Sequence, residues 1–254
     1  MLTDTQKQQF DDAGYVVVEG VVQGDLLTQL QDAVRLIGEA EPNRRGWNER
    51  SCFRRAPFRR FLDAERLVQV AHDLIGDDVQ LLRLDLLKMG AGDGMSNWHR
   101  DAGFVCGKTL SVTGAVYLQD TSLDVGPLRV VPRSHRREYA PTQTGAKVLD
   151  GEVSLPVPAG AAIFHDSCLW HTASANRSTV DCWGVFPIFG RYWIKRLDSQ
   201  FTQPLPADLL LTKDPVKRQL LGLELKSGTP TYFHDDDEYY QCGDAGIDFP
   251  LKES

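Results

Sequence analysis

The sequence predicts an all-β core with flanking helices, in the form of a sandwich or jelly roll. Before Gly76 the chain carries apolar residues at helical spacing. After it come several short runs rich in β-branched and aromatic residues, separated by glycine and proline turns. The 254 residues, 42% of them hydrophobic, are enough for one large domain. We expect that domain to span 1–254, with N-terminal helices over about 1–76, the β core over about 77–200 and a C-terminal helical extension over about 201–254.

The N-terminal region is expected to form helices around one short strand. Thr3 and Gln6 have the spacing of a capping box, which predicts the start of a helix. The β-branched run after Gly14 predicts a buried strand, and Gly76 is a natural end for the last helix. The expected ranges are 3–14, 24–39 and 63–75 for the helices and 15–18 for the strand.

The β core is expected to follow in six main strands. The glycine-rich stretch 90–94 and the pair Gly126-Pro127 predict loops between them. The expected strands are 79–89, 110–118, 128–131, 153–157, 161–164 and 180–189.

The net charge, the hydropathy and the cysteines argue against some partners and compartments. The net charge of −7 argues against nucleic acid as a partner, because nucleic-acid binders usually present a basic face. No apolar run approaches the length of a membrane span, so no membrane partner is expected. An odd number of cysteines without a Cys-x-x-Cys pair favours thiols in a reducing cytoplasm over a disulfide framework. The sequence makes no prediction of oligomeric state.

Two histidines and an aspartate form the candidate metal site. His99 and Asp101 would point to the same face if they lay on a strand, because side chains alternate along it. His171 follows a predicted buried strand that runs into a loop. Together these three side chains have the donor set of a non-haem Fe(II) oxygenase. A second His-x-Asp pair, His234 and Asp236, lies in an acidic run and is expected to be a solvated loop.

Several ordered motifs resemble the phytanoyl-CoA dioxygenase family of Fe(II)/2-oxoglutarate oxygenases. Arg133 stands where the family usually has glycine, within a segment similar to its Gly-Pro-Leu…Pro-Gly-Ser-His motif. The resembling segments are Phe10–Val18, Trp98–Asp101, Gly126–His135, His171–Asn176, Trp193–Lys195 and Leu220–Gly222.

The resemblance implies a cupin-like double-stranded β-helix with iron at one mouth. His99, Asp101 and His171 would ligate Fe(II), with 2-oxoglutarate and O2 as cosubstrates. The implied reaction is hydroxylation, or another oxidation such as desaturation or ring formation, of a small organic metabolite or natural-product intermediate. Trp98, His165, Cys182 and Trp183 would lie around the metal or line its pocket.

One departure from the family pattern concerns the cosubstrate. The family anchors the far carboxylate of 2-oxoglutarate with an arginine about eleven residues after the second histidine, and that position here is Cys182. Arg177, Lys88 or Lys108 could replace it. The alternatives are an iron-dependent oxygenase or lyase-like enzyme that does not use 2-oxoglutarate, and a catalytically silent protein that binds metal or ligand.

An arginine-rich stretch with interleaved aromatic residues lies over 44–60. Arg54, Arg55 and Trp47 are candidate contacts for a small-molecule substrate with an anionic group. The other interpretation is a basic surface that offsets an acidic body.

Overall fold

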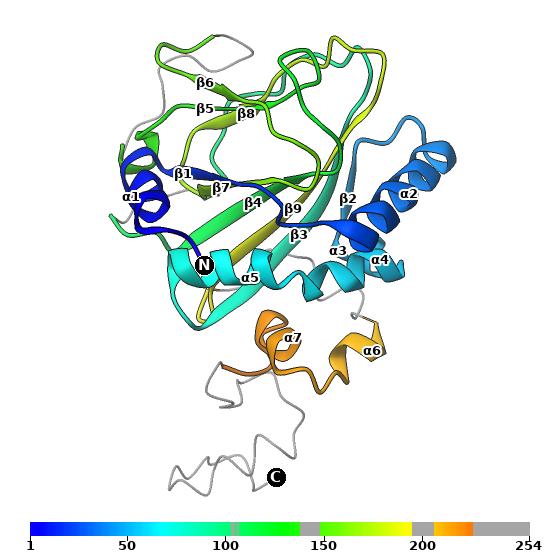
Figure 1. Ribbon diagram of the computed structural model, residues 1–254, viewed down its shortest axis with the longest axis vertical. Helices are drawn as coiled ribbons and strands as arrows, with labels where there is room; N and C mark the ends of the chain where they lie inside the picture. The colour runs from blue at the N-terminus through cyan, green and yellow to red at the C-terminus, as the bar shows by residue number, and fades with distance from the viewer. Residues whose placement is uncertain (103–104, 106, 138–147, 195–205, 226–254) are drawn as a thin grey trace, which may run out of the picture.

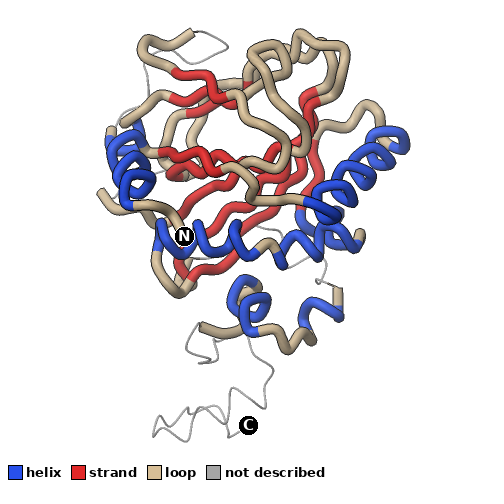
Figure 2. The backbone as a smooth tube through the Cα atoms, viewed as in Figure 1, coloured by secondary structure: helices blue, strands red, loops and turns tan. Residues whose placement is uncertain are grey.

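Two β-sheets packed face to face form the centre of the molecule, with helices against the outer face of the larger one (Figure 1). The computed structural model describes residues 1–102, 105, 107–137, 148–194 and 206–225. The all-β core with flanking helices is therefore confirmed, and Figure 2 shows the strands at the centre with helices at their side. Within the described residues, no helix is both long and apolar enough to cross a bilayer.

The N-terminal elements follow the expected order. Helix α1 (Asp4–Ala13) begins at a capping box formed by Thr3 and Gln6 and ends at Gly14, whose φ of 85° is in the left-handed region. Strand β1 (Tyr15–Val18) alternates, with Val16 and Val18 buried and the other two half-buried. Helix α2 (Gly24–Ala40) buries one stripe that includes Leu30, Val34 and Ile37.

The arginine-rich stretch folds into short elements. Its described arginine side chains are exposed or half-buried, and some of them bond to distant segments, as Arg45 does to Asp93, while Trp47, Phe53 and Phe58 are buried. Its elements are β2 (Gly46–Asn48), α3 (Glu49–Phe53) and α4 (Ala56–Arg60). The 3-10 turn η1 (Phe61–Asp63) and helix α5 (Glu65–Ile75) follow it. The last helix thus starts two residues later than expected, and the three-residue β2 was too short to predict from its sequence.

The larger sheet has six strands in the order β1-β7-β4-β9-β3-β2. Its remaining strands are β3 (Val79–Met89), β4 (Ser111–Tyr117), β7 (Ala162–Asp166) and β9 (Cys182–Arg191). The smaller sheet, in the order β6-β5-β8, contains β5 (Leu128–Val130), β6 (Val153–Leu155) and β8 (His171–Ala173). The strand β8 was expected to be loop, so the second candidate histidine opens a strand.

The two faces of the larger sheet bury different clusters. Its outer face packs on the helices through residues such as Val112, Phe164 and Val185. Its inner face meets the smaller sheet, where Ala115, Ile163 and the β5 residues Leu128 and Val130 are buried together. Because side chains alternate along a strand, the register fixes which residues face this interior.

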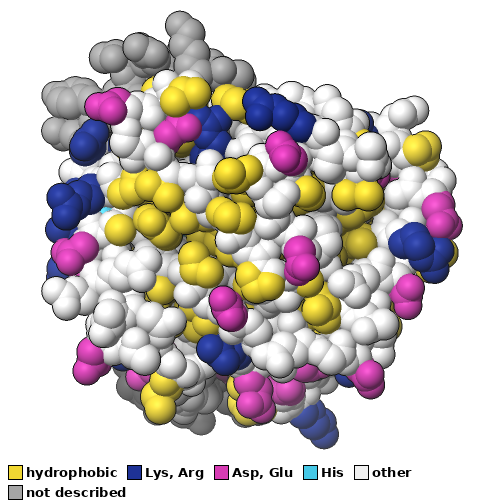
Figure 3. All heavy atoms as spheres, turned by 45° about the horizontal axis from the view of Figure 1, so that its top comes forward, with side chains coloured by type: hydrophobic (Ala, Val, Ile, Leu, Met, Phe, Trp, Pro, Cys, Tyr) yellow, Lys and Arg dark blue, Asp and Glu magenta, His cyan; other side chains and the backbone are white. Residues whose placement is uncertain are grey.

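The described residues after β9 include two short helices. Helix α6 (Ala207–Leu210) and helix α7 (Pro215–Leu220) follow, and Asp214 caps the second through its carboxylate. His234 and Asp236 lie outside the described residues. In the face shown in Figure 3, acidic and basic side chains are interspersed, and apolar side chains gather between them.

Candidate metal centre

The three predicted metal ligands come together at one end of the barrel interior. The candidate donor atoms of His99, Asp101 and His171 all lie within 4.8 Å of one another. Oδ1 of Asp101 is 3.9 Å from Nε2 of His99 and 3.7 Å from Nε2 of His171. This spacing lets one cation contact all three donors, because metal–donor bonds in such sites are about 2.1 Å long.

Both histidines have the same hydrogen-bonding pattern. Nδ1 of His99 is 2.9 Å from the carbonyl oxygen of Asn97, and Nδ1 of His171 is 2.9 Å from that of Leu169. A carbonyl oxygen only accepts, so each Nδ1 carries a proton, and Nε2 is the ring nitrogen that remains to bind a metal. Such second contacts orient metal-binding imidazoles in known sites.

Asp101 is held by a hydroxyl from the neighbouring strand. Oγ1 of Thr113 on β4 donates a hydrogen bond of 2.6 Å to Oδ2 of Asp101, which leaves Oδ1 facing the histidines. Burial opposes ionisation of this carboxyl group, but the hydrogen bond from the Thr113 hydroxyl favours its charged form, and the pKa of Asp101 is lowered. The group is therefore a carboxylate at neutral pH and can bind a cation.

The histidines deeper in the barrel are held neutral. Burial lowers the pKa of His171 to about 3, and burial also lowers the pKa of His165. The ring centroid of His165 lies 4.3 Å from that of His171, and its Nδ1 faces the carbonyl oxygen of Asp166 at 3.1 Å. His165 thus packs directly beside a candidate ligand.

The way the chain presents His99 differs from the expectation. His99 forms a single bridge with His171, through two backbone hydrogen bonds of 3.0 Å, and Asp101 lies in a bend beyond it. The prediction that these residues lie on a strand was wrong. Pairing with β8, rather than strand alternation, brings the first histidine to the second.

The family follows from the comparison with known sequences. The family model described as phytanoyl-CoA dioxygenase (PhyH) matches residues 10–181. The chain belongs to this family. The matched range contains all three ligands of the candidate centre. Among curated proteins, none matches the chain.

Solved structures share the fold of this PhyH member. EctD from S. alaskensis with bound Fe has a TM-score of 0.62 at 21% identity, over 75% of this chain and 77% of its own. HygX from Streptomyces hygroscopicus with nickel and 2-oxoglutarate has a TM-score of 0.67 at 16% identity, over 78% of this chain and 90% of its own. SnoK, a non-haem carbocyclase from nogalamycin biosynthesis, has a TM-score of 0.64 at 19% identity, over 75% and 85% of the two chains. The core of the PhyH member is thus the cupin-like jelly roll.

The register places three predicted pocket residues on the outer face of the large sheet. Lys88 pairs with Trp183, and Trp47 stacks on Trp183 with ring centroids 5.3 Å apart. Nζ of Lys88 donates to the carbonyl oxygen of Pro42 at 2.6 Å and lies 3.5 Å from Oδ2 of Asp181. These residues lie under the helices, on the side of the sheet away from the metal centre.

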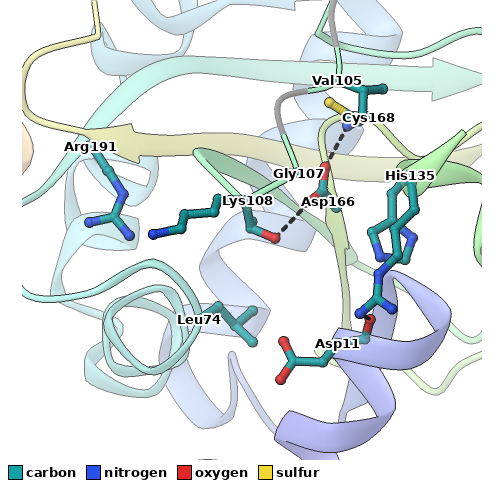
Figure 4. Close-up of a pocket in the computed structure, with 11 residues that line it drawn as sticks. Asp11, Leu74, Val105, Gly107, Lys108, His135, Asp166, Cys168 and Arg191 are labelled. Atoms are coloured by element: carbon teal, nitrogen blue, oxygen red, sulfur yellow. Dashed lines mark hydrogen bonds between the residues drawn. The ribbon is translucent and has the colours of Figure 1, made fainter. Parts of the chain in front are cut away.

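Lys108 also lies outside the barrel. It lines a pocket of about 320 Å³ together with Arg191 and the outward-facing Asp166, and its side chain extends towards Arg191 (Figure 4). Asp166 pairs with Val112, whose side chain is in the outer cluster, so this pocket and the metal centre lie on opposite faces of β7. The structure does not bring Lys108 to the candidate ligands.

The remaining cation candidates are on loops and helix ends. Arg177 is exposed, and its backbone N–H donates to the carbonyl oxygen of Asp124 at 2.7 Å. Arg54 is exposed, and Arg55 donates to the carbonyl oxygen of Ser51 at 3.0 Å. No described contact joins these arginines to the metal centre.

Trp98 and Cys182 are both buried, in different clusters. Trp98 is only 4% exposed and lies under the guanidinium of Arg129, 5.3 Å from the ring centroid to Cζ. Cys182 faces the barrel interior among apolar residues, and burial raises the pKa of its thiol to about 12.

Three polar residues on the inner face escaped the sequence reasoning. They are Thr113 on β4 and the pair Arg83 and Asp85 on β3. Arg83 and Asp85 are the two charged residues at alternate positions within an otherwise apolar part of this strand. This alternation could have identified them, because it puts both charges on one face of a strand that is otherwise buried, where charged residues are uncommon.

Proposed function

We propose that this PhyH-family protein is a non-haem Fe(II)- and 2-oxoglutarate-dependent dioxygenase that oxidises a small organic molecule. The convergence of His99, Asp101 and His171 carries the proposal. Two neutral imidazoles and one carboxylate on one side of a cation leave its other positions open, as an oxygenase requires.

The residues present fit the implied Fe(II). His99, Asp101 and His171 would hold the ion, which supplies activation of O2 coupled to conversion of 2-oxoglutarate to succinate and CO2 when it is bound. Thr113 fixes the rotamer of the carboxylate, and the Asn97 and Leu169 carbonyls fix the two rings. The apolar residues around His171 exclude water from the inner side of the centre.

A small molecule is the substrate class that the relatives support. One structure of EctD contains 2-oxoglutarate and 5-hydroxyectoine, and HygX contains 2-oxoglutarate. The carboxylate of Asp101 favours hydroxylation or another hydrogen-abstracting oxidation over halogenation, because halogenation needs the carboxylate's place on the metal to be empty.

Anaerobic loading with Fe(II) followed by 2-oxoglutarate tests the proposal. We expect a visible metal-to-ligand charge-transfer band, and succinate formation once O2 is admitted. O2 consumption without succinate would indicate a different electron source. Binding of Fe(II) with no band and no O2 consumption would indicate a silent binding protein, and either result would contradict the proposal.

A further inference from the structure

The far carboxylate of 2-oxoglutarate needs a cation that the expected position does not supply. Cys182 is 3% exposed and packs among apolar side chains on the inner face. A carboxylate is costly to desolvate unless a hydrogen-bonding cation accompanies it. Lys88 and Lys108 lie on the outer side of the sheet, as described above, and Arg177 is exposed on a loop.

Arg83 is a cation on the inner face of the large sheet. It lies in the row of paired residues that leads across the sheet to Thr113, beside the metal centre. The register pairs Arg83 of β3 with Ile188 of β9, and Ile188 with Thr113 of β4. Three paired residues in neighbouring strands share one face, and two strand spacings separate the outer two Cα atoms by about 10 Å. Thr113 holds Asp101, so Arg83 lies in the same row of the sheet as the residue that orients a metal ligand.

The guanidinium of Arg83 is positioned and accessible. Its Nε lies 2.7 Å from Oδ2 of Asp85, and the side chains of the two residues are 46% and 16% exposed. Asp85 itself is within electrostatic reach of Asp101, since the Asp101 charge adds to the burial that raises the pKa of Asp85. Within the described residues, no hydrogen bond or ion pair is found for either Nη of Arg83. The two Nη groups therefore present a fork suited to a carboxylate.

We propose that Arg83, oriented by Asp85, binds the far carboxylate of 2-oxoglutarate in place of the arginine that the family has at position 182. This inference rests on the proposed function, since it concerns the cosubstrate of that reaction. It assigns the cosubstrate an anchor on β3, across the sheet from Thr113, rather than at the start of β9.

Comparison of two 2-oxo acids tests the anchor by binding alone. The Fe(II)-loaded protein is titrated anaerobically with 2-oxoglutarate and with 2-oxopentanoate, which has a methyl group in place of the far carboxylate. The charge-transfer band gives each dissociation constant. We expect the unchanged protein to prefer 2-oxoglutarate by roughly tenfold to a hundredfold, the range for hydrogen bonds to charged groups. Arg83→Gln should abolish this preference, and Arg83→Lys should retain part of it.

The ratio of the two dissociation constants within each variant distinguishes loss of the anchor from a general loss of binding or folding, which would weaken both 2-oxo acids alike. Arg35→Gln is the matched control, because Arg35 on α2 forms a comparable exposed ion pair with Glu39, at 3.0 Å, away from the site. A full preference retained by Arg83→Gln, or no preference in the unchanged protein, would overturn the anchor while leaving the proposed function intact. Failure of both 2-oxo acids to give a band with the unchanged protein would overturn the proposed function together with the anchor.

Discussion

The Thr113 hydroxyl donates a hydrogen bond of 2.6 Å to the Oδ2 atom of Asp101, and this contact directs Oδ1 of the carboxylate towards His99 and His171. The residues belong to different segments, a β-strand and a bend, so the strand supplies the rigidity that the bend lacks. The metal centre therefore depends on a residue that is not itself a ligand.

Removal of this hydroxyl should weaken metal binding. We expect Thr113→Val to reduce Fe(II) affinity by roughly tenfold or more, as is typical for groups that orient a metal ligand. Thr113→Ser keeps the hydroxyl and should bind close to normally. Calorimetric titration under anaerobic conditions measures both. Equal affinity of the valine variant and the unchanged protein would show that Asp101 needs no such support.

Loss of a ligand should remove turnover without unfolding the protein. The His99 side chain is 51% exposed, so His99→Ala should change the unfolding free energy by no more than about 0.5 kcal/mol. The same variant should lose the charge-transfer band and succinate formation. His72→Ala, on α5 and outside the metal centre, is the histidine control for the band. Normal turnover by the His99 variant would refute its assignment as a ligand.

The stability of the metal-free protein should fall as the pH drops below neutral. Burial lowers the pKa of His171 from 6.5 to about 3 and also lowers the pKa of His165. Between these values the unfolded chain binds more protons than the folded chain, so stability is complete above about pH 6.5 and declines towards acid. Urea denaturation from pH 7.5 to 5 measures this. His165→Asn should flatten the slope, and a pH-independent midpoint in the unchanged protein would contradict the prediction.

An arginine at position 182 should destabilise the fold. Cys182 is 3% exposed within the apolar inner cluster, so Cys182→Arg would bury a charge and overpack the interior. We expect a loss of about 3 kcal/mol or more in unfolding free energy, against about 1 kcal/mol for Cys182→Ala. Chemical denaturation of the two variants distinguishes them. A stable arginine variant would mean that this part of the interior has room for the family's own anchor.

A glycine at position 133 should stabilise the protein. Arg133 has a φ of 67°, the left-handed value, and its side chain is exposed. In this conformation a residue with a Cβ destabilises the folded state by about 1 kcal/mol or more, and glycine does not. Part of that gain is lost because glycine raises the conformational entropy of the unfolded chain. We expect Arg133→Gly to raise the unfolding free energy by about 0.5 kcal/mol, measured by urea denaturation, with Arg133→Ala unchanged. A less stable glycine variant would show that the Arg133 side chain contributes more than its backbone costs.

The sequence was most informative where a local pattern and the tertiary structure agree. The capping box at Thr3, the left-handed glycine after α1 and the long apolar strand β3 were all predicted within a residue or two. The three candidate ligands also lie together, but not through the strand alternation that the sequence suggested. His99 reaches His171 through a bridge between distant segments, and no local pattern encodes that pairing.

Side-chain direction across the sheet was the main information that the sequence lacked. Lys88 and Trp183 were expected near the pocket, yet their register puts them on the outer face. One residue before Trp183, at the start of β9, Cys182 faces inward. A shift of a single position reverses the face of a strand residue, and the register depends on partners far along the chain.

The two histidines of the centre differ greatly in accessibility, with side chains 51% exposed for His99 and 7% for His171. One side of the coordination sphere is thus fixed in the packed interior, while the other opens to bulk solvent. We expect a divalent ion to enter and leave by that route while the barrel stays folded. Folding and metal acquisition would then be separable events, and the ion bound by the finished protein would depend on what the surrounding solution offers.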